Sequence, residues 1–206
     1  MSRSLHPDEI RRFFARDAVI CARELIGMSF QWYGTEGRIV ETEAYRAVGD
    51  PACHTFFRAS AREFVAQKTP GTAYLYLNYG MYWLLNFLTG DTSGPGFVLI
   101  RALEPVAGLP VMRERRGGRP DRALCSGPGK LTLALGLDGR HHATDFWDDP
   151  QVALTKPAGA APQVRADRRI GISRAVDYPW RFTAAGADPW LSKPYRPDEG
   201  RKADKI

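Results

Sequence analysis

Residues 73–88 read AYLYLNYGMYWLLNFL, two aromatic-rich apolar runs on either side of Asn78-Tyr79-Gly80. Runs of this length and composition are typical of β-strands, and a short connection with a glycine is typical of a hairpin. We therefore expect strands at 73–77 and 81–88. Tyr79 then lies at the hairpin tip, where a large ring buries little surface and packing explains it poorly.

Further strand-sized segments lie on both sides of this hairpin. Residues 28–33 and 37–45 are expected to pair across a turn at Gly34, and residues 97–103 form a nearly continuous apolar run. Helices are expected at residues 7–16, 17–25, 60–67 (with Ser60 as cap), 106–116, and from Ser126, with Ser126 as cap and Pro128 in the first turn. Short connections without a regular βαβ rhythm favour a mainly antiparallel α+β fold.

Composition limits the class of protein. The 206 residues are 44% hydrophobic and 25% charged, which predicts one globular domain over residues 1–206. The formal charge of +6 favours an acidic partner such as nucleic acid. Three scattered cysteines suit a reducing compartment, and neither a signal peptide nor a membrane-spanning stretch is expected, so the predicted location is the cytoplasm.

Residues 38–45, RIVETEAY, carry two carboxylates on one predicted strand. Alternate residues of a strand share a face, so Glu41, Glu43 and Tyr45 point one way, and Glu43 and Tyr45 lie roughly 6.6 Å apart. This face is either the wall of a polar cleft or the solvent side of an edge strand. From this segment alone the edge strand is the simpler interpretation.

The hairpin aromatics also allow two interpretations. Tyr79 could enter a duplex and fill the space left by an extruded nucleotide, and Tyr76, on the same face as Tyr74, could stack on a base. Alternatively, Tyr74, Tyr76 and Tyr82 are core residues. Asn86 could form a pocket floor with its amide, or only bond to the backbone.

His54 and Arg101 are single polar residues whose roles depend on their surroundings. His54 follows Cys53 in a loop expected at 48–57, but no further ligands fall at zinc spacing, so no metal site is predicted. Arg101 ends an apolar strand and could extend to solvent, or orient an anion or a water molecule at a cleft.

Residues 126–130, SGPGK, open a predicted helix whose backbone amides and Lys130 could bind a phosphate. The segment is not a Walker loop, because Leu124 and Leu131 occupy the positions of the required glycine and hydroxyl residue. A nearby basic stretch either contacts DNA phosphates or is a solvated face. It comprises Arg113, Arg115, Arg116, Arg119 and Arg122.

Taken together, residues 37–45, 70–86, 99–105 and 124–128 resemble the alkyladenine (3-methyladenine) DNA glycosylases of the mammalian type, which also occur in many bacteria. The resemblance extends from about residue 22 to residue 192. It implies a single mixed domain around a curved, mainly antiparallel sheet flanked by helices, with no metal or organic cofactor. Residues 46–51 depart from the family pattern, and the C-terminal third matches only at residues 169–172 and 189–191.

The resemblance also implies roles for individual residues. Glu43 corresponds to the general base and Arg101 to the residue that holds the attacking water. Base-binding positions correspond to Tyr45, His54, Tyr76 and Asn86, of which Asn86 discourages guanine. Tyr79 corresponds to the intercalating side chain. Further residues predicted to bind DNA are Met81, Ser126, Gly127 and Lys130.

The predicted function is therefore a monofunctional glycosylase of base excision repair, acting as a monomer on double-stranded DNA near the nucleoid. It would flip out alkylated or deaminated purines (3-methyladenine, hypoxanthine, ethenoadenine) and hydrolyse the N-glycosidic bond. No lysine accompanies Glu43, so lyase chemistry is not expected. The alternatives are a non-catalytic nucleic-acid-binding module, and a small-molecule hydrolase, for which no Gly-x-Ser-x-Gly nucleophile motif is present.

Overall fold

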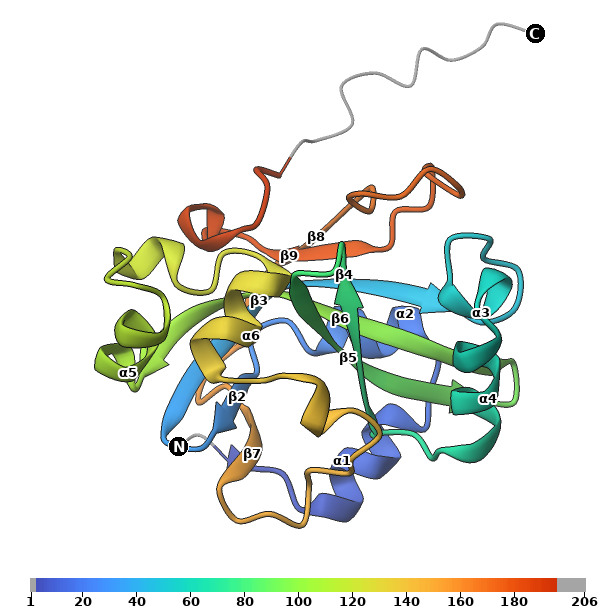
Figure 1. The fold of residues 1–206 in the computed structure, drawn as a ribbon, viewed down its shortest axis with the longest axis horizontal. Coiled ribbons are helices and arrows are strands. Elements are labelled where there is room, and N and C mark those ends of the chain that lie inside the picture. The colour runs from blue at the N-terminus through green and yellow to red at the C-terminus, as the bar shows by residue number, and fades with distance from the viewer. Residues whose placement is uncertain (1–2, 196–206) are drawn as a thin grey trace, which may run out of the picture.

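A nine-stranded sheet built mainly from hairpins runs through the molecule (Figure 1). The computed structural model describes residues 3–195. The main strand order is β1-β7-β2-β3-β6-β5-β4, with β9 paired to β3 and β8 paired to β9, and every pair is antiparallel. The strands are β1 Arg3–Ser4, β2 Ser29–Trp32, β3 Thr35–Arg46, β4 Ala73–Asn78, β5 Tyr82–Asp91, β6 Gly94–Ala107, β7 Val152–Lys156, β8 Val164–Asp167 and β9 Arg181–Ala184. The α+β expectation is confirmed.

Short helices surround this sheet. They are α1 Pro7–Phe14, α2 Ala18–Glu24, α3 His54–Phe57, α4 Ala59–Gln67, α5 Leu109–Arg115 and α6 Pro128–Leu135, with single 3-10 turns at Asp121–Ala123, Gly139–His141 and Asp188–Trp190. Side chains cap the first two helices: His6 and Glu9 form a capping box on α1, and Asp17 caps α2. In Figure 1, α3 and α4 lie at one end of the sheet and α5 at the other. No helix within residues 3–195 is long and apolar enough to cross a membrane.

The predicted alternation along β3 is present. Val40 and Ala44 are buried in the main apolar core, and the Thr42 hydroxyl donates to the Ala22 carbonyl at 2.7 Å. Glu41 and Glu43 face the other way and are also fully buried. The edge-strand interpretation is wrong, because β3 is flanked by β2, β6 and β9.

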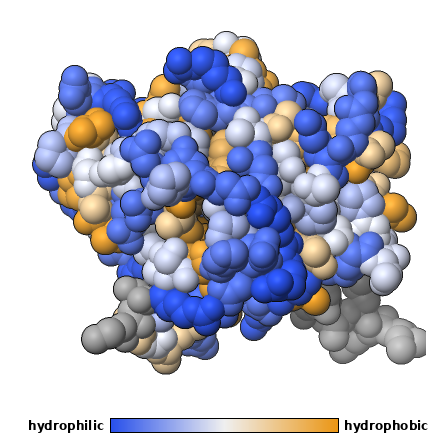
Figure 2. Space-filling view, turned by 90° about the horizontal axis from the view of Figure 1, so that it is seen from below, coloured by the Kyte–Doolittle hydropathy of each residue, from blue (hydrophilic) through white to orange (hydrophobic). Residues whose placement is uncertain are grey.

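Two apolar clusters hold the sheet and its helices together. The larger one contains stacked and edge-on rings, for example the stacked pair Phe14 and Trp147 with centroids 5.9 Å apart. The smaller one lies under β4 and α4 and is made of Cys53, Ala61, Phe64, Tyr74, Leu88 and Phe97. Burial of these side chains is the main stabilising contribution. On the face in Figure 2, apolar residues are scattered among polar ones, as on an ordinary protein surface.

Several predicted boundaries need correction. The loop expected at 48–57 contains α3, and α4 begins one residue before Ser60, with no side-chain cap. The N-cap of α6 is Gly127 rather than Ser126, whose hydroxyl instead accepts from Lys130 at 3.4 Å. The helix expected at 106–116 begins only at Leu109, because residues up to 107 continue β6.

A left-handed glycine separates β6 from α5. Gly108 has φ +75°, and a Cβ there would lie 2.5 Å from the Gly34 carbonyl oxygen of the β2–β3 turn. This close approach requires glycine, and the helix after it begins three residues later than the predicted start at residue 106.

Candidate active site

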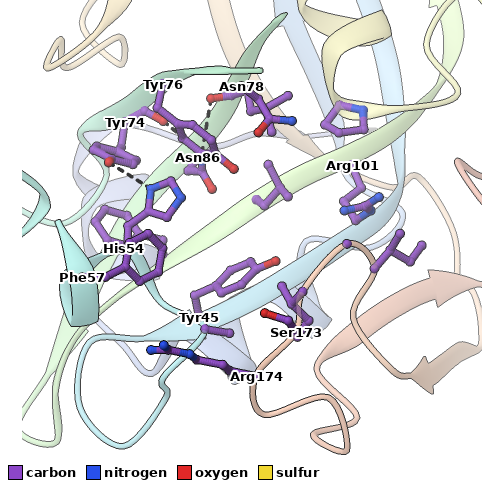
Figure 3. A pocket seen from close by; sticks show the side chains of 18 of the residues that line it. Tyr45, His54, Phe57, Tyr74, Tyr76, Asn78, Asn86, Arg101, Ser173 and Arg174 are labelled. Atoms are coloured by element: carbon purple, nitrogen blue, oxygen red, sulfur yellow. Dashed lines mark hydrogen bonds between the residues drawn. The ribbon is translucent and has the colours of Figure 1, made fainter. Parts of the chain in front are cut away.

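One cavity of about 500 Å³ opens between the β4–β5 hairpin, α3 and the segment 170–174 that joins β8 to β9. Its size is that of ordinary small-ligand pockets. Figure 3 shows Tyr45 on one side and Tyr74, Tyr76 and Asn86 on the other, with His54 and Phe57 at one end and Arg101 at the opposite end. Strands β3, β4, β5 and β6 thus each contribute a side chain to the same space.

The aromatic walls are held by contacts with one another. The ring centroids of His54 and Tyr76 are 4.2 Å apart in an edge-to-face arrangement, and His54 Nδ1 lies 3.1 Å from the Tyr74 hydroxyl. Burial, with a smaller contribution from Arg58, lowers the pKa of His54 to about 4, so its ring is neutral near pH 7. Of the tyrosines that could have been core residues, Tyr74 is buried, Tyr76 is partly buried and Tyr82 is exposed.

Glu43 lies directly behind the cavity wall and does not itself line the cavity. Its Oε1 accepts the Ile170 amide N–H at 2.7 Å, and its Oε2 accepts the Tyr45 hydroxyl at 2.7 Å and Arg101 Nη1 at 3.2 Å. All three donors belong to residues that line the cavity. A carboxylate offers about four acceptor positions, so one remains for a further donor.

Glu41 has the opposite character, although it shares the strand face. Its two oxygens accept Arg181 Nε at 2.7 Å, the Ser192 amide at 2.6 Å, the Ser192 hydroxyl at 2.8 Å and Arg101 Nε at 3.3 Å. These four donors use the acceptor capacity of the carboxylate. Glu41 therefore joins β3 to β6, β9 and the segment at Ser192, and is a structural counter-ion.

Arg101 and Tyr45 both stay protonated and can donate hydrogen bonds to Glu43. Arg101 is buried between the two glutamates, so its extension to solvent is ruled out. Burial opposes its charge, but Glu43 and Glu41 outweigh this and raise the Arg101 pKa. Burial, helped by Glu43, raises the Tyr45 pKa well above its usual value, so the phenol stays protonated and donates to Glu43.

The hairpin tip is exposed, as predicted. Tyr79 is 83% exposed and adopts φ +51°, and Met81 beside it is 65% exposed. Tyr79 also lines the mouth of the cavity. A ring this exposed adds little to folding stability and is available for a partner.

Asn86 lies at the cavity and also bonds to the backbone, so it combines the two predicted roles. It is buried at the cavity, and its Nδ2 donates to the Tyr74 carbonyl at 3.1 Å and the Leu84 carbonyl at 3.3 Å. Both amide hydrogens therefore face acceptors, which fixes the orientation of the amide. Its oxygen is the polar atom left for contact with a bound molecule.

The predicted phosphate contacts lie outside the cavity lining. Among residues 126–130, Pro128 alone lines the cavity, while the exposed Lys130 points to Ser126. Three arginines of the basic stretch are used within the protein: Arg113 pairs with Asp121, Arg115 bonds to the carbonyls of Ala134 and Leu135, and Arg116 bonds to the Ala123 carbonyl. Arg119 and Arg122 are exposed.

The sequence did not predict a role for the C-terminal third, and the structure places residues of this third at the cavity. Segment 170–174 closes one side of the cavity, Ile170 donates to Glu43, and Arg169 pairs with Asp50 at 2.6 Å. The signal that could have found this segment was residues 169–172, which match the family pattern. Within residues 3–195, no cluster of three or more His, Cys, Asp or Glu residues could hold a metal ion, and the three cysteines are buried and free.

Comparison with known proteins yields one consistent result. The sequence profile of the family described as "Methylpurine-DNA glycosylase (MPG)" matches residues 12–188. A protein of Nitrosospira multiformis named "Putative 3-methyladenine DNA glycosylase" is 46% identical over 183 residues, covering 89% of this chain and 93% of that protein. Proteins of the same name from Rhodopseudomonas palustris (strain BisB18) and Rhizobium etli are 44% and 46% identical, covering 93% and 94% of this chain and 94% and 93% of theirs.

Proposed function

The chain belongs to the methylpurine-DNA glycosylase family, and from this premise we propose that it is a monofunctional glycosylase that releases alkylated or deaminated purines from duplex DNA. The substrates proposed are 3-methyladenine, hypoxanthine and ethenoadenine. The observation that carries the proposal is the aromatic cavity with a fully buried, hydrogen-bonded carboxylate directly behind its wall. The whole chain acts as one glycosylase domain, as a monomer.

In the proposed mechanism Glu43 activates water. As the base departs, positive charge develops on the deoxyribose, and a fixed carboxylate both stabilises this charge and accepts the proton of the attacking water. The remaining acceptor position of Glu43 would take that water, and Arg101, bonded to the same carboxylate, would keep it in place. A positioned general base contributes roughly 10²–10⁴-fold to the rate.

Extrusion of the nucleotide is assigned to the hairpin tip. Tyr79 would enter the duplex and replace the extruded base, beside Met81, while Ser126, Gly127 and Lys130 contact the phosphate backbone. Extrusion costs a few kcal/mol, and less for damaged or mispaired bases, so part of the selectivity comes from the DNA.

Within the cavity, the base would lie between Tyr45 on one side and His54 and Tyr76 on the other. Electron-rich tyrosine rings attract a cationic alkylpurine by about 0.5–2 kcal/mol each. Asn86, whose orientation is fixed by two backbone carbonyls, would discourage guanine by contact with its exocyclic amine. No lysine lines the cavity within residues 3–195, which is consistent with hydrolysis rather than lyase chemistry.

Duplexes that each carry one lesion test the proposal. After incubation with the protein, alkali cleaves the strand at any abasic site, and we expect cleavage only after alkali. If none of the three lesions is released, the assignment as a glycosylase is wrong. If the protein binds lesion DNA but releases no base, the alternative of a non-catalytic nucleic-acid-binding module is favoured. Strand cleavage without alkali would reject the monofunctional assignment.

A further inference from the structure

A second buried ion pair lies next to the cavity, outside the network of Glu41, Glu43 and Arg101. Both side chains of this pair, Asp50 and Arg169, are 0% exposed. Two parallel hydrogen bonds join them, Nη1 to Oδ2 at 2.6 Å and Nη2 to Oδ1 at 2.8 Å, across a sequence separation of 119 residues. This is the planar two-bond geometry that arginine forms and lysine does not.

Asp50 organises the segment that leads from β3 to α3. Its carboxylate also accepts the amide N–H groups of Arg46 at 3.3 Å and Ala52 at 3.1 Å. Ala52 and the following His54 line the cavity. The position of this wall therefore depends on the orientation of the Asp50 carboxylate.

Arg169 lies beside two of the residues that donate to Glu43, Tyr45 and Ile170. Its guanidinium bonds to the Ala44 carbonyl at 3.0 Å and lies over the Tyr45 ring, 4.6 Å from the ring centroid. The next residue, Ile170, donates its amide to Glu43 at 2.7 Å. One side chain thus supports two of the three donors that hold Glu43.

Burying an arginine–aspartate pair is costly, and apolar residues of similar volume often give equal or greater stability. The pair therefore needs an explanation other than stability alone. We propose that Asp50 and Arg169 are positioning residues for base release, because together they hold the Ile170 amide on Glu43 and the Tyr45 ring on the cavity wall. This inference rests on the proposed function.

Loss of the two-bond geometry should affect the reaction more than DNA binding. A displacement of about 1 Å in a catalytic arrangement can cost about 10²-fold in rate. The Ile170 amide should also exchange with solvent faster, because its position on Glu43 depends on the pair.

The test compares Arg169→Lys with a matched control, Arg165→Lys. Arg165 lies on β8 four residues earlier, bonds to Asp188 at 2.9 Å and lies over the Tyr195 ring at 4.3 Å, but does not line the cavity. Three quantities are measured: single-turnover base release at saturating protein, affinity for duplex DNA with a stable abasic-site analogue, and hydrogen exchange of the Ile170 amide by NMR.

For Arg169→Lys we expect base release to slow by roughly 10–100-fold, with faster Ile170 exchange and an affinity within about threefold of the unmodified chain. Arg165→Lys should change neither the rate nor the exchange. A folded Arg169→Lys with the original rate and the original Ile170 exchange, or an equal loss of rate in both variants, overturns the proposal.

A second variant covers the case in which Arg169→Lys does not fold. Asp50→Asn keeps the shape of the side chain and removes its charge, and it should slow base release and speed Ile170 exchange in the same way. Original values for both overturn the proposal. If the unmodified chain releases no base, the proposed function fails, and the Ile170 exchange still decides whether the pair positions this amide.

Discussion

Replacing each of the two β3 glutamates by glutamine separates a catalytic from a structural carboxylate. Glu43 and Glu41 lie two residues apart on the same strand face, and both are fully buried. They differ in their partners, because Glu43 accepts three hydrogen bonds and Glu41 accepts four. We predict that the first change removes activity and the second removes stability.

Glu43→Gln keeps the side-chain size but cannot accept a proton from water. Losing a general base of ordinary efficiency slows base release by about 10²–10⁴-fold, or about 2.7–5.4 kcal/mol of barrier. The amide nitrogen must also face the Ile170 N–H or the Tyr45 hydroxyl, both of which are donors. One such mismatch costs about 1–3 kcal/mol of stability.

Glu41→Gln removes the carboxylate that Arg181 and Ser192 share, and leaves Arg181 with a single counter-ion, Asp167, at 2.8 Å. Removing one partner of a buried ion pair costs about 3–5 kcal/mol. Arg101 keeps its bond to Glu43, so base release by the folded fraction should slow by less than about tenfold, well below the factor for a lost general base.

The assay is single-turnover base release with protein in excess over a duplex that carries one hypoxanthine, combined with urea denaturation of each variant. The expected result is a folded Glu43→Gln that binds lesion DNA but is inactive, and a destabilised Glu41→Gln that is active below its melting temperature. A Glu43→Gln rate within threefold of the unmodified chain would refute the reasoning. So would a folded Glu41→Gln with the slower rate of the two.

Three further predictions concern the hairpin tip, His54 and the first turn of α6. Tyr79→Ala should change the free energy of unfolding by no more than about 0.5 kcal/mol, since the ring is 83% exposed. At limiting protein it should slow base release from duplex DNA but not from single-stranded DNA. If the variant and the unmodified chain release the base from the duplex at equal rates, the wedge role of Tyr79 is wrong. His54 has a folded pKa of about 4 against 6.5 when unfolded, so the unfolded chain binds more protons between these values and stability falls as pH drops from 6.5 to 4. The free energy of unfolding should fall by about 2–3 kcal/mol from this group. Urea denaturation at pH 7 and at pH 4.5 should show a smaller fall for His54→Gln than for the unmodified chain. Gly129→Ala would bring a Cβ within 2.7 Å of Tyr82 Cβ and should lower the free energy of unfolding, measured by urea denaturation, by about 1–3 kcal/mol. Gly159 has open space around it, so Gly159→Ala should lower it much less.

The parts of the fold that sequence predicts well are those set by neighbouring residues. The two hairpins follow from apolar runs and turn residues close in the chain, and the faces of β3 follow from simple alternation. Tyr79 could be placed at an exposed tip for the same reason. Helix starts are less certain, because a serine near the first turn, as at Ser60 and Ser126, resembles a cap wherever the helix begins.

The parts that sequence does not predict depend on residues far apart in the chain. Little that is local to residues 38–45 indicates whether the two carboxylates face solvent or a cleft, because all their partners except Tyr45 lie 58 to 151 residues away. Two of those partners, Ile170 and Ser192, donate backbone amides, which leave no mark on the sequence. The composition of the C-terminal third does not show which of its arginines are buried, and Arg169 and Arg181 are buried counter-ions of Asp50 and Glu41.

This arrangement explains why the acidic strand and the C-terminal third must fold together. An ionised carboxylate is tolerated inside a protein only when donors and opposite charges replace its water. Glu43 receives its donors from β3, β6 and the segment after β8, and Glu41 receives its own from β6, β9 and Ser192. In the proposed enzyme, burial removes competing water while these donors hold the Glu43 carboxylate in one orientation. A general base held in this way is ready before DNA binds.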